Sequence, residues 1–176
     1  MLRTYLALTD AIARLSGYVG AAAMAAIAVL IIAEVFMRGL FNYSLSFAWE
    51  SATYCLMGAV FLGAAFTLRS DGHIRVNLLT ENVPKSLGRL VDMACTLVGI
   101  GFCAFLTHAL TQKTLDDFAS GSHTPTPMET PLVIPGGVIA LGLLMLTLQM
   151  VARLVRLFLG EPPEIDPVSA GFQVEK

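Results

Sequence analysis

Hydrophobic and polar positions divide this chain into four long apolar stretches separated by short polar segments. The stretches contain no Asp, Glu, Lys or Arg, and they cover Leu15–Ala33, Ser51–Leu68, Met93–Gln112 and Thr130–Ala152. A helix rises about 1.5 Å per residue, so about 20 apolar residues cross the hydrocarbon core of a bilayer. The pattern therefore predicts four transmembrane helices. They are expected at about residues 15–37, 47–69, 86–112 and 131–156.

The fold class follows from the same stretches. A backbone inside lipid must satisfy its own hydrogen bonds, which leaves helices and closed β-barrels as spanning structures. A barrel would show apolar and polar residues alternating along each strand, and these stretches show no alternation. We predict an all-α membrane protein with one four-helix transmembrane domain over residues 1–160. The Pro-rich, acidic segment 161–176 is expected to be a disordered cytoplasmic tail.

The segment before the first apolar stretch has a pattern of its own. Apolar residues recur at helical spacing over residues 2–13, while Arg3, Asp10 and Arg14 lie off that face. This spacing predicts a short amphipathic helix at the membrane interface that leads into the first span. The first stretch is longer than the apolar region of a usual signal peptide and ends in Glu34, so we expect a retained anchor.

The distribution of Lys and Arg predicts the orientation of the helices. Nine of the eleven lie in the N-terminal segment, between the second and third helices, and after the fourth helix. Arg38 and Lys113 lie in the other two connections. Because loops rich in Lys and Arg stay in the cytoplasm, both termini are expected inside and segment 113–131 outside. Three prolines make that outer segment an expected irregular loop, with at most a short helix before Gly121.

Small residues recur at four-residue steps within the apolar stretches. The first stretch has Gly17, Ala21 and Ala25, and the second has Ala59 and Gly63. Such steps let membrane helices approach closely, so they mark candidate helix–helix contacts. The first helix is the richest in alanine and is expected to pack most tightly.

Composition then narrows the functional classes. Charged residues make up 14% of the chain, against about 25% in soluble domains, and a net charge of −2 gives no sign of a nucleic-acid partner. The three cysteines lie inside predicted helices without a CxxC motif. The three histidines lie at unmatched depths, which argues against haem and metal sites. With no phosphate loop or nucleophile motif, we predict no enzymatic activity and no cofactor in this chain.

Three ionisable residues stand at the ends of helices that otherwise avoid charge. Glu34 and Arg38 are four residues apart with the acid first, which favours an intrahelical ion pair. The pair could be structural, could contact a partner subunit or lipid headgroups, or could contain a proton-coupling carboxylate. Glu50 opens the second helix, where an acid favours the positive N-terminus.

The order of these features resembles the small membrane subunit of tripartite ATP-independent periplasmic (TRAP) transporters. The resemblance rests on "EVFMRGLF", "SLSFAWES" and "GAAFTLRSDGHIRVNLL", and on the Ser/Pro stretch that leads to "VIPGGVIAL". Its best cue is Arg69 followed by His73, just after the second helix. Glu50 keeps an acidic place of the family, whereas Phe47 and Trp49 stand where the family often has Trp and a second acid.

The resemblance implies a scaffold role in a transporter of the bacterial inner membrane. The small subunit binds a much larger permease subunit, which holds the substrate and sodium sites and moves the substrate across the membrane. A separate periplasmic protein captures the substrate, usually an organic acid, and delivers it. Sodium drives uptake and is expected at the large subunit, with membrane lipids as further partners of this chain.

Under this interpretation, seven residues are candidate contacts with the large subunit or with lipid headgroups. They are Glu34, Arg38, Trp49, Glu50, Arg69, His73 and Arg75. Two other interpretations stay open at this point. One is a self-contained, small multidrug-type exporter that couples to protons through Glu34, and the other is a structural subunit of a respiratory or sensory membrane complex. The exporter would need Glu34 near the bilayer centre and away from a neutralising arginine.

Overall fold

The computed structural model describes residues 2–70 and 85–160. Within them it has four helices, and each is long and apolar enough to cross a membrane. They are α1 (Leu2–Phe41), α2 (Ser46–Arg69), α4 (Lys85–Ser120) and α5 (Val133–Leu159). The prediction of an all-α membrane protein with four spanning helices is confirmed. His73, Arg75 and the predicted tail lie outside the described residues.

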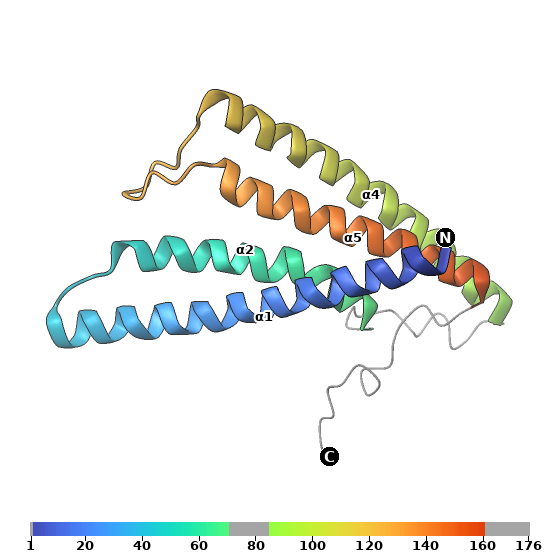
Figure 1. Cartoon of the computed structure of the whole chain (residues 1–176), viewed down its shortest axis with the longest axis horizontal. Coiled ribbons are helices and arrows are strands. Elements are labelled where there is room, and N and C mark those ends of the chain that lie inside the picture. The colour runs from blue at the N-terminus through green and yellow to red at the C-terminus, as the bar shows by residue number, and fades with distance from the viewer. Residues whose placement is uncertain (1, 71–84, 161–176) are drawn as a thin grey trace, which may run out of the picture.

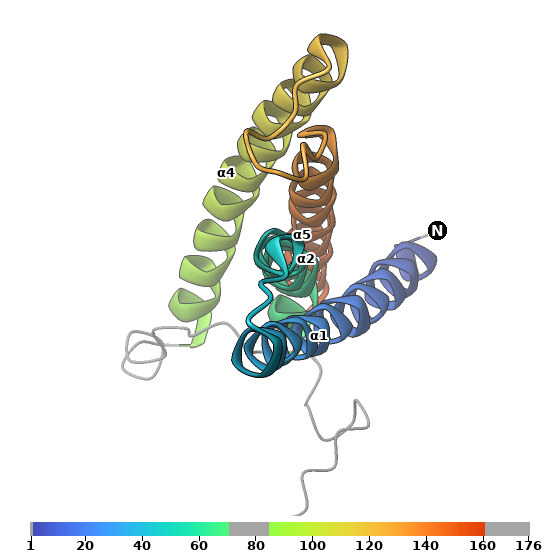
Figure 2. The same ribbon diagram turned by 90° about the vertical axis from the view of Figure 1, so that its left-hand side faces the viewer.

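The helices form two antiparallel pairs, α1 with α2 and α4 with α5 (Figure 1). The pairs meet through α2 and α5, and in the part of the chain that the structure describes α4 touches only α5 (Figure 2). We call one end of the bundle the loop end, because it carries connections 42–45 and 121–132. We call the other the terminal end, because α1 begins there and α5 ends there (Figure 1). The two pairs splay apart toward the loop end (Figure 1).

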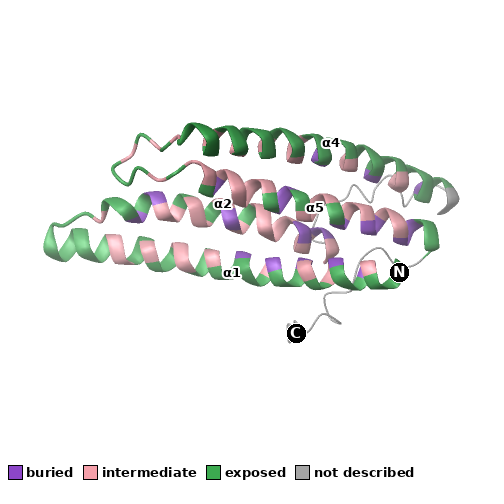
Figure 3. Ribbon diagram, turned by 45° about the horizontal axis from the view of Figure 1, so that its top comes forward, coloured by how far each residue is buried: buried purple, intermediate pink, exposed green. Residues whose placement is uncertain are grey.

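Burial is uneven across the four helices. In the most apolar stretch of α1, 6% of the residues are buried, and in that of α5, 28% of the residues are buried. Figure 3 shows the same contrast, with buried residues on α5 and α2 and mostly exposed residues on α4 and on the loop-end half of α1. Because these exposed residues are largely apolar, α1 and α4 offer faces suited to lipid or to another membrane protein.

The N-terminal segment is one helix with the first span. Leu6, Thr9 and Ala13 are buried and Arg3 and Arg14 are exposed, as the amphipathic pattern predicts, but Asp10 lies on the packed side, where it bonds to α2 and α5. This face packs against the other helices: the Tyr5 hydroxyl donates to the Leu148 carbonyl of α5 at 3.0 Å. The sequence suggested an interfacial helix followed by a separate span from about residue 15. The structure instead has one continuous helix from Leu2 to Phe41, because no proline or glycine interrupts the chain before Gly17.

The helix α4 extends further into the predicted outer loop than expected. It runs to Ser120, and Lys113 pairs with Asp117 one turn on at 3.3 Å. The helix ends at Gly121, whose φ of 61° is the left-handed conformation that terminates helices. Prolines begin only after this point, so the irregular connection is 121–132 rather than 113–131.

Two glycines bring helix backbones into close contact. A Cβ added to Gly20 of α1 would lie 3.2 Å from the Ala59 carbonyl oxygen and 3.5 Å from Gly63 of α2. A Cβ added to Gly142 of α5 would lie 2.6 Å from the Phe61 carbonyl group. Backbone atoms cannot turn aside as a side chain can, so Gly142 leaves no room for a side chain, and a methyl group at Gly20 would make a tight contact with α2. The predicted Ala59 and Gly63 step lies in the α1–α2 contact, where Gly20 meets it.

Gly142→Ala is predicted to destabilise the bundle, because its methyl group would overlap the backbone of α2. Overpacking costs about 1–3 kcal/mol, and we expect a lower midpoint of thermal unfolding in detergent micelles. Gly137→Ala is the matched control on the same helix, since nothing lies within 4 Å of its added Cβ. Equal unfolding midpoints for the two variants would contradict this account of the α2–α5 contact.

Candidate functional site: two charged layers and an apolar groove

The Asp10 carboxylate joins three helices at the terminal end. It accepts hydrogen bonds from Arg69 Nε of α2 at 2.9 Å and from Arg156 Nη2 of α5 at 2.8 Å. The Gln149 amide nitrogen lies 3.5 Å from the same carboxylate. The side chains of Arg69 and Arg156 are 11% and 4% exposed. One acid therefore neutralises part of the charge of two buried arginines and fixes α1 against α2 and α5.

A second ion pair joins the remaining helix to the bundle. Arg153 of α5 donates to Asp92 of α4 at 3.0 Å. The Arg89 side chain of α4 also donates to the Leu157 carbonyl in the last turn of α5. A cation at a helix C-terminus interacts favourably with the carbonyl groups exposed there. We call Asp10, Arg69, Asp92, Arg153 and Arg156 the terminal layer.

At the loop end, Glu34 organises the turn between α1 and α2. Its carboxylate pairs with Arg38 and accepts the Ser44 hydroxyl at 2.9 Å. Its other oxygen accepts the backbone N–H of Leu45 at 2.6 Å. Leu45 is the N-cap residue of α2, and its own side chain makes no capping hydrogen bond. Glu34 of α1 therefore holds the start of α2 through the backbone N–H of Leu45.

Glu50 plays a comparable part for connection 121–132. Its carboxylate accepts the Tyr54 hydroxyl at 2.5 Å and the Thr124 hydroxyl at 3.2 Å. Thr124 in turn pairs with Thr130 across the connection, with a backbone hydrogen bond of 2.9 Å. This acid attaches the α4–α5 connection to the start of α2, so the two helix pairs are joined at the loop end by a side chain. We call Glu34, Arg38, Glu50, Lys113 and Asp117 the loop layer.

The two layers have the separation of a bilayer core. Glu50 and Arg69 are 19 residues apart on α2, which is about 28 Å along a helix. Asp92 and Lys113 of α4 are 21 residues apart, or about 32 Å. A hydrocarbon core is about 30 Å thick. On α2 and α4, the charged groups are therefore spaced to reach the headgroup regions on both sides of a bilayer, with uncharged helix between them.

The seven predicted contact residues fall into three groups. Arg38 and Trp49 are open to partners, since the Arg38 side chain is 67% exposed and Trp49 is 83% exposed. Glu34, Glu50 and Arg69 are engaged within the chain by the hydrogen bonds given above. His73 and Arg75 lie outside the described residues.

The terminal layer also contains residues that the sequence pattern did not single out. They are Asp10, Asp92, Arg153 and Arg156, and Gln149 lies beside them. One signal was available: Asp10 is the only acid of the N-terminal segment, which also contains Arg3 and Arg14. A lone acid on a basic side of a membrane protein is a candidate ion-pair partner, but the sequence does not say which arginine it meets.

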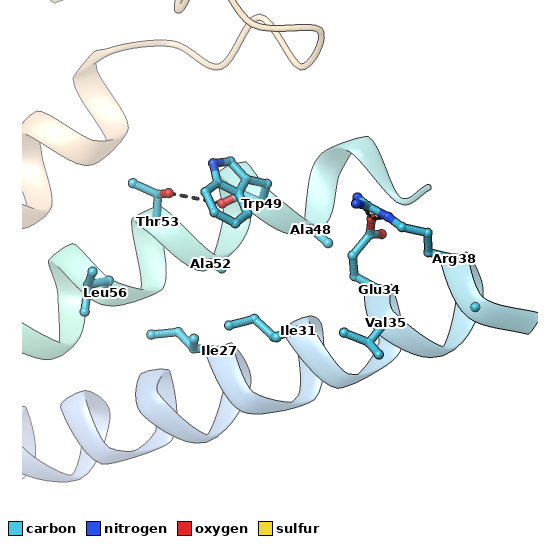
Figure 4. Close-up of a pocket in the computed structure, with 11 residues that line it drawn as sticks. Ile27, Ile31, Glu34, Val35, Arg38, Ala48, Trp49, Ala52, Thr53 and Leu56 are labelled. Atoms are coloured by element: carbon cyan, nitrogen blue, oxygen red, sulfur yellow. Dashed lines mark hydrogen bonds and ion pairs between the residues drawn. The ribbon is translucent and has the colours of Figure 1, made fainter. Parts of the chain in front are cut away.

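An apolar groove lies between α1 and α2 next to the loop layer. It encloses about 610 Å³, and Ile27, Ile31 and Val35 of α1 face Ala52 and Leu56 of α2 across it. Figure 4 shows Ile27 and Ile31 pointing from α1 toward α2, with the Glu34–Arg38 pair at the end nearest the turn. The groove is lined almost entirely by hydrocarbon and has charge at one end only.

The comparison with protein families decides the identity of this arrangement. The family described as "Tripartite ATP-independent periplasmic transporters, DctQ component" matches residues 27–160, about three quarters of the chain. The chain belongs to the DctQ family. No curated protein matches it, and no solved structure matches it either.

The family match and the four spanning helices together establish what kind of protein this DctQ chain is. It is the small membrane component of a TRAP transporter, which confirms the resemblance seen in the sequence. With four spanning helices it is a multi-pass protein of the inner membrane. DctQ is a family of transporter components and not of enzymes. Within residues 2–70 and 85–160, no three His, Cys, Asp or Glu side chains gather in a way that could hold a metal ion.

Asp10→Asn is predicted to destabilise the DctQ bundle strongly. It leaves the buried Arg156 without its charged partner, and breaking a buried ion pair from one side costs about 3–5 kcal/mol. The free energy of unfolding in mixed micelles measures this loss. Asp117→Asn is the control, because its partner Lys113 is 68% exposed and such pairs contribute at most about 1 kcal/mol. A similar loss in both variants would contradict the role given to Asp10.

Glu34→Ala is predicted to loosen the α1–α2 turn without unfolding the helices. It removes the acceptor of the Leu45 N–H, so exchange of that amide with solvent deuterium should accelerate about tenfold, as expected for one lost hydrogen bond. Glu34→Gln keeps an acceptor oxygen and should accelerate exchange less. If amide exchange at Leu45 is the same in all three proteins, Glu34 does not hold this turn.

Proposed function

We propose that this DctQ chain is the immobile scaffold subunit of a sodium-driven TRAP transporter that takes up an organic acid. In this role it binds the large permease subunit and braces it. The family match supports the transporter, and the resemblance to TRAP small subunits supports sodium and an organic acid. The residues that bind sodium and substrate would belong to the larger subunit.

The observation that carries the scaffold role is the use of charge in the described helices. Charged residues of the described helices lie in, next to or beyond the two layers, and between the layers the only one is Arg14, one turn from Asp10 on α1. A carrier of organic anions would need cations or other polar ligands at membrane depth. Here the charges instead join helices to one another, with Asp10, Glu34 and Glu50 each binding groups from other elements. Such an arrangement suits a scaffold subunit that does not move during transport.

The exposed apolar faces supply the surface for the large subunit and for lipid. Phe102 and Phe105 of α4 are 62% and 66% exposed, and Val35 and Phe36 of α1 are 64% and 60% exposed. These residues lie between the layers or beside the loop layer. A membrane partner of similar length would pack there, while Arg38 and Trp49 would contact it, or lipid headgroups, at the interface.

The orientation belongs to the same proposal. The terminal layer contains Arg69, Arg153 and Arg156, whereas the loop layer contains Arg38 and Lys113 as its cations. Further Lys and Arg residues of the sequence belong to the terminal end of the bundle. The positive-inside rule therefore predicts that the terminal end faces the cytoplasm. Connection 121–132 would then face the periplasm, on the side where the substrate-binding protein arrives.

The two other interpretations have less support. A proton-coupled exporter would need Glu34 free at mid-membrane, but its carboxylate is bound by Arg38, Ser44 and the Leu45 N–H at the loop end. A subunit of a respiratory or sensory complex would not be expected to match the DctQ family.

Purification of the tagged DctQ chain in mild detergent is predicted to bring down a large, many-helix permease, identified by mass spectrometry. Vesicles that contain both subunits and are given the periplasmic protein should accumulate an organic acid when a sodium gradient is applied. Vesicles that contain this chain alone should accumulate none, because the proposal assigns the cargo site to the permease.

Two outcomes would overturn the scaffold role. One is capture of a respiratory or sensory protein in place of a permease. The other is sodium-dependent accumulation of a solute by the chain alone. Empty vesicles and vesicles in which sodium is equal on both sides serve as the controls.

A further inference from the structure

The groove between α1 and α2 has the length of one leaflet of a bilayer. It runs from Ile27 to Arg38, which are 11 residues apart on α1, or about 16 Å along the helix axis. Half of a hydrocarbon core is about 15 Å. The groove therefore begins near the middle of the bilayer and ends at the loop layer, where headgroups lie.

The walls of the groove suit a hydrocarbon chain. Ile27, Ile31 and Leu56 line its deeper part, and α2 contributes two small side chains, Ala52 opposite Ile31 and Ala48 nearer Glu34 (Figure 4). The groove has a volume of about 610 Å³, which is enough space for a slender hydrocarbon chain.

The charged end of the groove has one group available to a ligand. Both oxygens of Glu34 are taken by the turn, and Arg38 uses Nε and Nη2 toward Glu34 and Ser44. Among the described residues nothing bonds to Arg38 Nη1, and the side chain is 67% exposed. Guanidinium groups bind phosphate oxygens well. Trp49 stands beside this end at 83% exposure, in the position favoured by Trp at membrane interfaces.

We propose that the groove binds one phospholipid of the leaflet around the loop end. One acyl chain lies along Ile27, Ile31 and Leu56, and the phosphodiester contacts Arg38. A lipid held in this way would complete the α1–α2 packing that the open groove leaves unfinished. This site goes beyond the scaffold role and depends neither on sodium transport nor on which end of the bundle is cytoplasmic.

The test measures phospholipid retained by the complex of DctQ with its permease. The complex is purified in mild detergent, stripped of loosely bound lipid, incubated with phosphatidylethanolamine of one defined mass, and analysed by native mass spectrometry. Ile31→Trp fills the groove and should lower the lipid-bound fraction about tenfold, since an overfilled pocket loses its ligand contacts. Ile32→Trp is the matched control: Ile32 is the next residue, 56% exposed and not part of the lining, and this variant should retain lipid as the wild type does.

The charged end is tested separately, so that the proposal does not rest on one variant that may fold poorly. Arg38→Gln should weaken retention of phosphatidylethanolamine about tenfold, as for a lost charge-assisted hydrogen bond. The same variant should leave retention of diacylglycerol, which lacks the phosphate, at the wild-type level. The proposal is overturned if the wild type retains no phospholipid, or if the two tryptophan variants lose it equally. It is also overturned if cross-linking from Ile31 reaches a helix of the permease.

Discussion

A single carboxylate, that of Asp10, holds arginines from two other helices inside an otherwise apolar bundle. Its importance follows from the solvent. Lipid tails are as apolar as leucine, so burying leucine gives membrane helices little reason to associate. Polar pairs and close packing must supply the specificity instead. Among the described residues, α1 makes its ion pairs with α2 and α5 through this one residue, at the terminal end of the bundle (Figure 1).

The rest of the arrangement extends this principle to the other contacts. Asp92 and Arg153 join α4 to α5, Glu50 attaches connection 121–132 to α2, and Gly142 lets α5 touch the backbone of α2. Each contact lies at headgroup depth or uses a small residue inside the apolar region. The bundle is therefore joined strongly at its two faces while most of the surface between them stays apolar and available.

That division suits a component that serves a larger one. A subunit that carried substrate would have to keep polar ligands inside the membrane and leave its helices free to move. This DctQ chain has its described charges at the two interfaces, and its most exposed helices, α1 and α4, lie on the outside of the array. Rigid ends and unfilled apolar faces are what a brace for a permease requires, and the groove beside Arg38 gives lipid a defined place in the same structure.

The sequence by itself determined the number and class of the helices, because spans must be long, apolar and free of charge whatever they pack against. It also located the charged residues at the loop end, since Glu34, Arg38 and Glu50 interrupt apolar runs. It did not determine where α1 begins, because the amphipathic face around Leu6 fits lipid headgroups or α5 equally well. Only the tertiary structure paired Asp10 with Arg69 and Arg156, because contacts between residues 59 and 146 positions apart leave no periodic trace in one sequence.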